Sequence, residues 1–320
     1  MTSAGRSTQL RRTRRNRKKR EHKNSVKLKI WFLETRPQFL LLSVVLAFLG
    51  NSIAWYDGSF NLRYALLAFI GLLLTHISVN TLNDYFDYKS GIDLETNRTP
   101  FSGGSGVLPE AMLSPRQVFW LGMGAFLLTI PIGIYFIIVR GWLLLPLLVV
   151  AAICILAYTP LILKTNYPEW VAGLGLGTLP VLGTYFVQTG AYLPGIIASI
   201  PSGFLVYNLL LLNEFPDVEA DKKAGRKTLP IVAGRKKAGI VYSILTIMVY
   251  VWIIGGVVIK QMPAFSLIAL LTLPLAIKAI QGARTPEDMT KLVPAMANNV
   301  LVVLLTQLLM GIGYILAVVF

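Results

Sequence analysis

Long apolar runs are the feature of this sequence that most restricts what it can fold into. Runs of about 20 residues recur through the 320-residue chain, which is 55% hydrophobic and only 14% charged. A helix needs about 20 apolar residues to cross about 30 Å of hydrocarbon, and a helix satisfies its own backbone polar groups there. We therefore predict an all-α, polytopic membrane protein with nine transmembrane helices, at about 37–56, 64–86, 116–139, 142–160, 169–189, 193–215, 238–259, 263–283 and 293–319.

The first 29 residues differ sharply from the rest, because they contain twelve Lys and Arg. We expect residues 1–29 to be a disordered basic tail that sets topology and is attracted to anionic lipid. Nucleic-acid binding is not expected, because no aromatic interleaving or folded module accompanies the charges. Residues 30–320 then form one nine-helix membrane domain.

The distribution of basic residues predicts the orientation. With the tail in the cytoplasm, the segments on that side contain 27 Lys and Arg, and the external segments contain three. This is the bias of cytoplasmic loops in membrane proteins. We predict a multi-pass protein of the cell membrane whose N-terminus and two longest loops, about 89–115 and 216–237, are cytoplasmic.

Two acidic clusters follow the second and sixth predicted spans. They hold eight of the fifteen acidic residues, Asp84, Asp87, Asp93, Glu95, Glu214, Asp217, Glu219 and Asp221. Helical residues four apart share a face. We therefore expect Asn83 and Asp87 to share one face, and Asn213, Asp217 and Asp221 to do the same in the second cluster. Pro216 is expected to kink or interrupt the second cluster. The number of intervening spans places both clusters on the cytoplasmic side.

Carboxylates at the end of a membrane span are costly and need counter-charge. Oxygen ligands suit Mg²⁺, or Mn²⁺, and Mg²⁺ is usually shared between one or two carboxylates and substrate phosphates. Two clusters on one face therefore predict a diphosphate bridged through metal. The alternative is a pair of solvated helix ends with surface ion pairs. One Cys and two His leave no Cys/His metal site, and His76 is expected to be a hydrogen-bonded core residue.

Basic side chains flank both clusters and could neutralise phosphate oxygens. They are Lys89, Arg98, Lys222, Lys223, Arg226 and Lys227. The Ser/Gly run over 102–106 could offer backbone N–H groups to an anion, or it could be only a flexible loop.

These residues resemble the UbiA superfamily of intramembrane aromatic prenyltransferases, and the resemblance covers about 36–320. Its NDxxDxxxD-type motif is matched by Asn83, Asp84 and Asp87, with the last aspartate displaced by two positions to Asp93. Its DxxxD-type motif is matched at 217 and 221. The strings NDYFDYKSGID, AGRKTLP and GTLPVLGTYFVQTG are similar to the 1,4-dihydroxy-2-naphthoate polyprenyltransferases of menaquinone synthesis, and also to archaeal relatives.

The resemblance implies nine helices around a central cavity and Mg²⁺-dependent transfer of a polyprenyl group from its diphosphate to an aromatic acceptor. It implies that Asp84 and Asp87 hold one metal ion and Asp217 and Asp221 another, with Asp93 also catalytic. The resemblance and the charges together indicate a set of substrate-binding residues: Asn83, Lys89, Arg98, Tyr158, Lys164, Asn213, Lys222, Arg226 and Lys227.

The acceptor and the functional class stay open at this level. The acceptor could instead be 4-hydroxybenzoate, geranylgeranylglyceryl phosphate, haem or chlorophyllide. A cation transporter would place its charges near the bilayer centre, whereas these lie at the ends of spans, and a scaffold protein would not need the aspartates. The sequence does not indicate an oligomeric state.

Overall fold

The computed structural model describes residues 27–95, 99 and 101–320, and this part of the chain contains helices and no strands. The predicted tail lies outside it except for its last three residues. Within it, eight helical segments are long and apolar enough to cross a membrane. They are α2 (Pro37–Tyr56), α3 (Leu62–Ser90), α5 (Pro115–Arg140), the run Glu169–Thr189, α9 (Gly195–Glu214), α12 (Arg235–Val258), the run Ala264–Ala283 and α14 (Met289–Val319).

Two of these segments are composite. The first joins α7 (Glu169–Gly173), the π-helix η2 (Leu174–Thr178) and α8 (Leu179–Thr189), and the second joins the 3₁₀ helix η3 (Ala264–Thr272) to α13 (Leu273–Ala283). Glycine lets η2 touch α9, because a Cβ at Gly177 would lie 2.5 Å from the carbonyl oxygen of Ser202. The backbones of the two helices are therefore in direct contact.

The ninth segment, α6 (Leu144–Leu156), has 13 residues and is shorter than the expected 142–160. Beyond Leu156 the chain turns through 157–161 into η1 (Ile162–Lys164). The predicted all-α fold is confirmed, and eight long helices and one short helix replace the nine full-length spans within the residues described.

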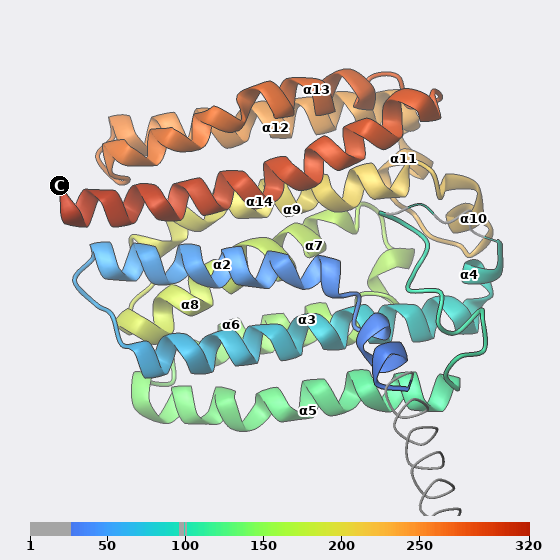
Figure 1. Cartoon of the computed structure of the whole chain (residues 1–320), viewed down its shortest axis with the longest axis horizontal. Coiled ribbons are helices and arrows are strands. Elements are labelled where there is room, and N and C mark those ends of the chain that lie inside the picture. The colour runs from blue at the N-terminus through green and yellow to red at the C-terminus, as the bar shows by residue number, and fades with distance from the viewer. Residues whose placement is uncertain (1–26, 96–98, 100) are drawn as a thin grey trace, which may run out of the picture.

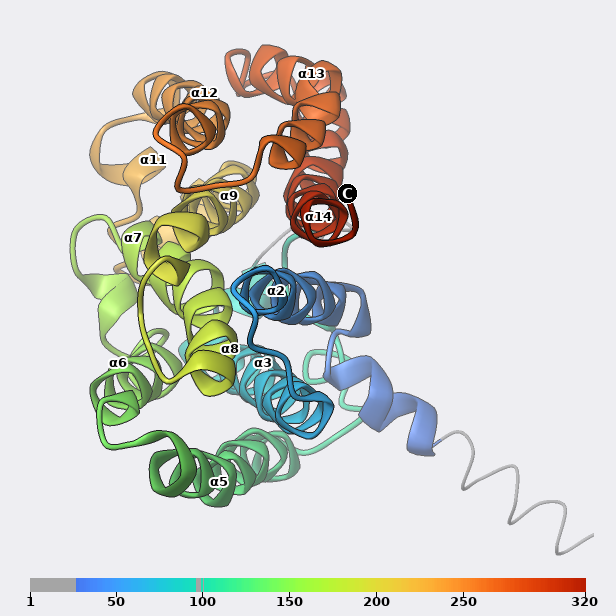
Figure 2. The same cartoon turned by 90° about the vertical axis from the view of Figure 1, so that its left-hand side faces the viewer.

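The long helices lie side by side, and three short helices gather at one end of the bundle (Figure 1). These are α4 (Ile92–Glu95), α10 (Val218–Lys223) and α11 (Leu229–Val232). The C-terminus lies at the opposite end (Figure 1). Figure 2 shows α2 near the middle of the end view, between α14 on one side and α3 on the other.

Burial follows this arrangement. The interior side of α2 is closely packed, with Leu49 and Ile53 fully buried. Large apolar side chains elsewhere point outward, among them Ile138 and Leu271. Outward apolar faces of this size are what a surface solvated by lipid tails requires.

Candidate active site

The ends of α3 and α9 meet at the end of the bundle that holds the short helices. Gly91, with φ of 84°, ends α3 and turns the chain into α4, which contains Asp93. On the other side, α9 ends at Glu214 and α10 begins at Val218, so the chain is interrupted at Pro216 as expected. The elements α4 and α10 contact each other (Figure 1). Both acidic clusters thus lie at one end, which we call the acidic mouth.

One guanidinium joins the two acidic clusters. Arg226 donates a hydrogen bond from Nη1 to Oδ1 of Asp221 at 2.8 Å, and its Nη2 pairs with Oδ1 of Asp87. The three side chains are at most 15% exposed. Ion pairs at such low exposure are screened little by solvent. The α3 and α9–α10 motifs are therefore linked through a shared cation.

Asp84 is covered by the loop that follows α4. The backbone N–H of Ser105 donates to Oδ2 of Asp84 at 2.8 Å, and Nη1 of Arg36 lies 3.4 Å from Oδ1. The Ser105 hydroxyl donates to Glu34 at 2.8 Å. Gly104 has φ of +71°, and a Cβ there would lie 3.3 Å from Oδ2 of Asp93. The Ser/Gly run thus directs an N–H to a carboxylate.

Negative charge is in excess at the acidic mouth. Burial and the nearby Asp87 raise the pKa of Asp93 to about 8. Burial and Asp221 raise the pKa of Asp217 to about 7, against a hydrogen bond from Ser102 that lowers it. Burial and Asp84 raise the pKa of Glu34 to about 8. The mouth therefore favours an added cation.

The donor set fits a hard divalent ion in chemistry and charge. The side chains of the mouth offer oxygen ligands of the kind that Mg²⁺ prefers. In the part of the chain described, no three His, Cys, Asp or Glu side chains are grouped closely enough to hold a metal as they stand. The guanidinium of Arg226 lies between Asp87 and Asp221 and supplies part of the missing positive charge.

A small cavity of about 160 Å³ lies just inside the mouth. Its polar lining includes Arg36, Asn83, Tyr158 and Asn213, and also His76 and Asn80. The Asn83 amide donates to Oγ1 of Thr159 at 3.2 Å. The Asn213 Oδ1 and the Tyr158 hydroxyl are buried and lack a hydrogen-bond partner among the residues that the structure describes. Buried polar atoms of this kind normally have partners, so both are available to a ligand.

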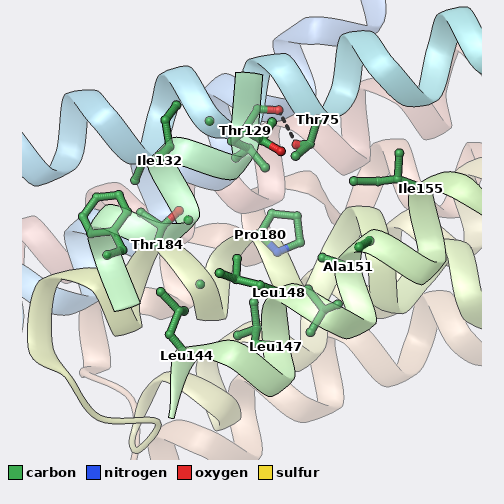
Figure 3. Close-up of a pocket in the computed structure, with 18 of the residues that line it drawn as sticks. Thr75, Thr129, Ile132, Leu144, Leu147, Leu148, Ala151, Ile155, Pro180 and Thr184 are labelled. Carbon is green, nitrogen blue, oxygen red and sulfur yellow. Dashed lines mark hydrogen bonds between the residues drawn. The ribbon is translucent and has the colours of Figure 1, made fainter. Parts of the chain in front are cut away.

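A larger, apolar cavity of about 350 Å³ continues from the small one. It lies between α2, α3, α5, α6, η2 and α8 (Figure 3). The two cavities share His76, Val79, Ile155, Gly175 and Leu176 as lining residues. His76 has the hydrogen bond expected of it, since its Nδ1 lies 2.8 Å from the Ser43 hydroxyl. It also borders both cavities, which the sequence did not indicate.

Four of the proposed substrate-binding residues lie outside the cluster. Lys89, Lys164, Lys222 and Lys227 are exposed, and the Lys89 ammonium lies 5.9 Å from the centre of the Tyr85 ring. Arg98 lies outside the residues that the structure describes. The remaining residues are brought to the acidic mouth or to the small cavity.

Sequence reasoning missed three charged residues that the fold brings to the site: Glu34, Arg36 and Glu169. Glu34 and Arg36 directly precede the first span, where lone charges are read as topology signals. Glu169 is the only acidic residue between Glu110 and Glu214, and an isolated carboxylate at the start of a span could have marked it.

Glu169 anchors the loop that contains Arg226. Glu169 is fully buried and accepts a hydrogen bond from the Leu229 N–H. Beside it, the Lys227 N–H donates to the Leu163 carbonyl at 3.0 Å, and the Tyr167 N–H donates to the Lys227 carbonyl at 3.3 Å. These bonds join segment 163–169 to segment 227–229 and fix the position of Arg226.

Glu169→Ala is therefore expected to lower the free energy of unfolding by about 1–3 kcal/mol, because the buried Leu229 N–H loses its acceptor. Glu169→Gln retains an acceptor oxygen and is expected to cost less. Thermal unfolding of the purified protein in detergent measures both variants. Equal losses for Ala and Gln would show that the hydrogen bond does not anchor this loop.

Comparison with known proteins places these features in a family. The profile of the UbiA prenyltransferase family matches residues 43–300. The 1,4-dihydroxy-2-naphthoate octaprenyltransferase of Bacillus subtilis (strain 168) is 29% identical over 274 residues, which covers 84% of this chain and 86% of that protein. The digeranylgeranylglyceryl phosphate synthase of Thermococcus kodakarensis is 32% identical over 225 residues, covering 68% of this chain and 75% of that protein.

A solved structure has the same fold. The structure of a UbiA homologue from Archaeoglobus fulgidus bound to GPP and Mg²⁺ has a TM-score of 0.59 at 16% identity. The match covers 88% of this chain and 99% of that chain. At this identity the likeness establishes the arrangement of helices.

Proposed function

Because the chain belongs to the UbiA prenyltransferase family, we propose that it transfers a polyprenyl group from a polyprenyl diphosphate to an aromatic acceptor at the acidic mouth. The observation that carries this proposal is the link between the two motifs, in which Arg226 pairs with both Asp87 and Asp221. A site built from opposed carboxylates around a cation has the charges needed to bind a metal-bridged diphosphate.

We assign Asp84 and Asp87 to one metal ion and Asp217 and Asp221 to another, with Mg²⁺ as the natural ion and Mn²⁺ as a chemically similar substitute. When bound, the metal stabilises the negative charge that develops on the leaving diphosphate. Arg226 neutralises phosphate oxygens in the same region. Arg36 stands beside Asp84 and does the same at the entrance of the small cavity.

The reacting end of the donor lies in the small cavity. There the bond between the first prenyl carbon and the diphosphate oxygen breaks, and the diphosphate keeps the electron pair. An acceptor ring carbon forms the new bond to the prenyl carbon and then loses a proton. The free oxygens of Tyr158 and Asn213 and the amide of Asn83 orient the acceptor. The apolar walls exclude water, which would otherwise capture the allylic cation.

We favour 1,4-dihydroxy-2-naphthoate as the acceptor, in which case the ring carboxylate also leaves as CO₂ and a proton takes its place on the ring. The Bacillus subtilis relative, which is similar over most of this chain, supports this choice. Geranylgeranylglyceryl phosphate is the competing acceptor, because the Thermococcus kodakarensis relative is as similar over a shorter region. The positive-inside bias supports a cytoplasmic location for the mouth.

A panel of acceptors separates these assignments. Purified protein is incubated with radiolabelled polyprenyl diphosphate and, in turn, 1,4-dihydroxy-2-naphthoate, 4-hydroxybenzoate and geranylgeranylglyceryl phosphate. Labelled product with the naphthoate alone is the expected result. Product only with the glycerol phosphate would move the assignment to lipid synthesis, and no product with any acceptor would reject the proposal.

Metal removal tests the role of the carboxylates. Treatment with EDTA is expected to abolish product formation, and added Mg²⁺ is expected to restore it, because the excess negative charge at the mouth otherwise repels the diphosphate. Initial rates at increasing free Mg²⁺ measure the dependence. Full activity in the presence of EDTA would contradict the metal assignments.

A further inference from the structure

We propose that the helix before the first span, residues 27–34, binds the surface of an anionic lipid bilayer, and that this binding fixes the position of Glu34 and Arg36 at the acidic mouth. The partner is the layer of phospholipid headgroups on the side of the mouth. The inference goes beyond the proposed function, because it concerns what positions the mouth rather than which reaction occurs there.

The first step is the direction of this helix. Residues 27–34 are helical, and α2 begins three residues later at Pro37. The helix, coloured blue and lying before α2, runs across the direction of the long helices in both views (Figures 1 and 2). In Figure 2 it projects sideways from the bundle. A helix that lies across the spans at the level where the first of them begins lies in the plane of the membrane surface.

The second step is the chemistry of its exposed side chains. Leu28 is 71% exposed and Phe32 is 62% exposed, and these residues, four apart, form one apolar stripe. Lys27 and Lys29 are exposed as well. Trp31 is half-buried and is of a type favoured at membrane interfaces. Exposed apolar side chains beside lysines match a helix that inserts among lipid headgroups.

The third step is the charge of the partner. The chain up to residue 29 contains twelve Lys and Arg and a single acidic residue, Glu21. Clusters of this kind are attracted to anionic phospholipid over about one Debye length, about 8 Å at physiological ionic strength. A nucleic acid would match the charge but not the exposed apolar stripe. The two features together favour an anionic bilayer.

The fourth step is the connection between this helix and the mouth. Glu34, at the end of the helix, is fully buried and accepts the hydrogen bond of the Ser105 hydroxyl. The N–H of the same serine donates to Asp84 at 2.8 Å. Two residues further on, Arg36 lies 3.4 Å from the other oxygen of Asp84. The end of the surface helix is therefore bound to a proposed metal ligand from two sides.

The backbone of this connection is held too. The Thr35 carbonyl accepts a hydrogen bond at 3.0 Å from the amide of Asn80, which lines the small cavity. Arg36 has φ of 54°, and Pro37 begins α2 directly after it. Residues 34, 35 and 36 each have a contact with α3 or the loop above it, so no free residue separates the surface helix from the mouth. A displacement of the helix would displace these contacts.

Amide hydrogen exchange of the full chain in lipid nanodiscs tests the inference. Discs of phosphatidylcholine are compared with discs that also contain phosphatidylglycerol. We expect phosphatidylglycerol to slow exchange by about threefold or more in residues 27–36 and also in residues 101–108, where the Ser105 N–H is bonded to Asp84. Initial rates of prenyl transfer in the same discs should rise by about twofold or more, because the lipid favours the ordered mouth.

Three variants locate the effect. Lys27→Glu combined with Lys29→Glu should remove most of the slowing in both segments. Leu28→Ser combined with Phe32→Ser keeps every charge and should do the same. Glu34→Ala should keep the slowing in residues 27–33 and lose it in residues 101–108, because the bond to Ser105 is missing.

The matched control is Lys236→Glu combined with Lys237→Glu. These lysines are exposed at the start of α12, at the same end of the bundle, so the variant changes the charge of that face by the same amount. It should behave like the unsubstituted protein. An equal loss in this variant would show a response to surface charge in general and would overturn the inference.

Two further results would also overturn it. Slowing confined to residues 27–36 in the unsubstituted protein would show that the helix binds lipid without acting on the mouth. Slowing of both segments by heparin in discs of phosphatidylcholine alone would show that the charges recognise polyanions rather than a lipid surface. The expected exchange pattern without prenylated product in any disc would support this inference and reject the proposed function.

Discussion

Asp87→Asn and Asp217→Asn are each expected to lower turnover by at least about 10²-fold, the scale seen when one charge-stabilising group is removed from a reacting centre. Asparagine keeps the size of the side chain and can still accept a hydrogen bond. It lacks the charge that, under the proposed assignment, holds a divalent ion against a diphosphate. Asp87 and Asp217 belong to different motifs. A loss of turnover in both variants would therefore indicate that the two motifs bind the same diphosphate.

Steady-state transfer of a labelled prenyl group measures the effect, with size-exclusion chromatography to show that each variant folds. Glu219→Gln is the matched control, because Glu219 lies on α10 between Asp217 and Asp221 in sequence and is exposed. It should retain the activity of the unsubstituted protein. Activity that survives in both aspartate variants would contradict the two-metal assignment.

Arg226→Ala is expected to lower both activity and stability. Removing the guanidinium leaves Asp87 and Asp221 unpaired in a buried site, and breaking a buried pair typically costs about 3–5 kcal/mol. The loss of stability should be largest in EDTA. Added Mg²⁺ should recover part of the stability, because a divalent ion supplies positive charge between the same carboxylates. Melting temperatures with EDTA and with Mg²⁺ measure this recovery.

Lys227→Ala is the control for Arg226, since Lys227 is the next residue in the same loop and is exposed. Its melting temperature should be close to that of the unsubstituted protein. Arg226→Lys should be intermediate, because an ammonium retains the charge but cannot form a fork to two carboxylates. An Arg226→Ala protein that is fully stable in EDTA would show that the bridge contributes little.

The spans could be predicted because lipid imposes a length. The first predicted span, 37–56, coincides with α2, since both are set by the same apolar run. The fourth was predicted too long. Tyr158 and Thr159 continue the apolar pattern well enough to count as membrane residues, but the chain has already turned and Tyr158 lines the small cavity. Hydropathy cannot distinguish a side chain that faces lipid from one that faces a cavity.

The shared position of the acidic clusters was predictable from the number of spans between them. Which of the basic residues reach the acidic mouth was not predictable. The sequence alone gives no reason to prefer Arg226 over its neighbour Lys227 as a site residue, yet of these two only Arg226 turns inward. The difference depends on backbone pairing between segments 163–169 and 227–229, and such a tertiary contact has no periodic signature. Arg36 and Glu34 reach the mouth for the same kind of reason.

The shortness of α6 has a consequence for the surrounding bilayer. Thirteen residues rise by about 20 Å, well below the ordinary thickness of the acyl region. Lipids beside this helix must compress, at a cost of fractions of a kcal/mol per ångström of hydrophobic mismatch. An apolar molecule with a polar group that diffuses past α6 would therefore enter a locally thinned annulus, where the polar group has the shortest distance to travel between leaflets.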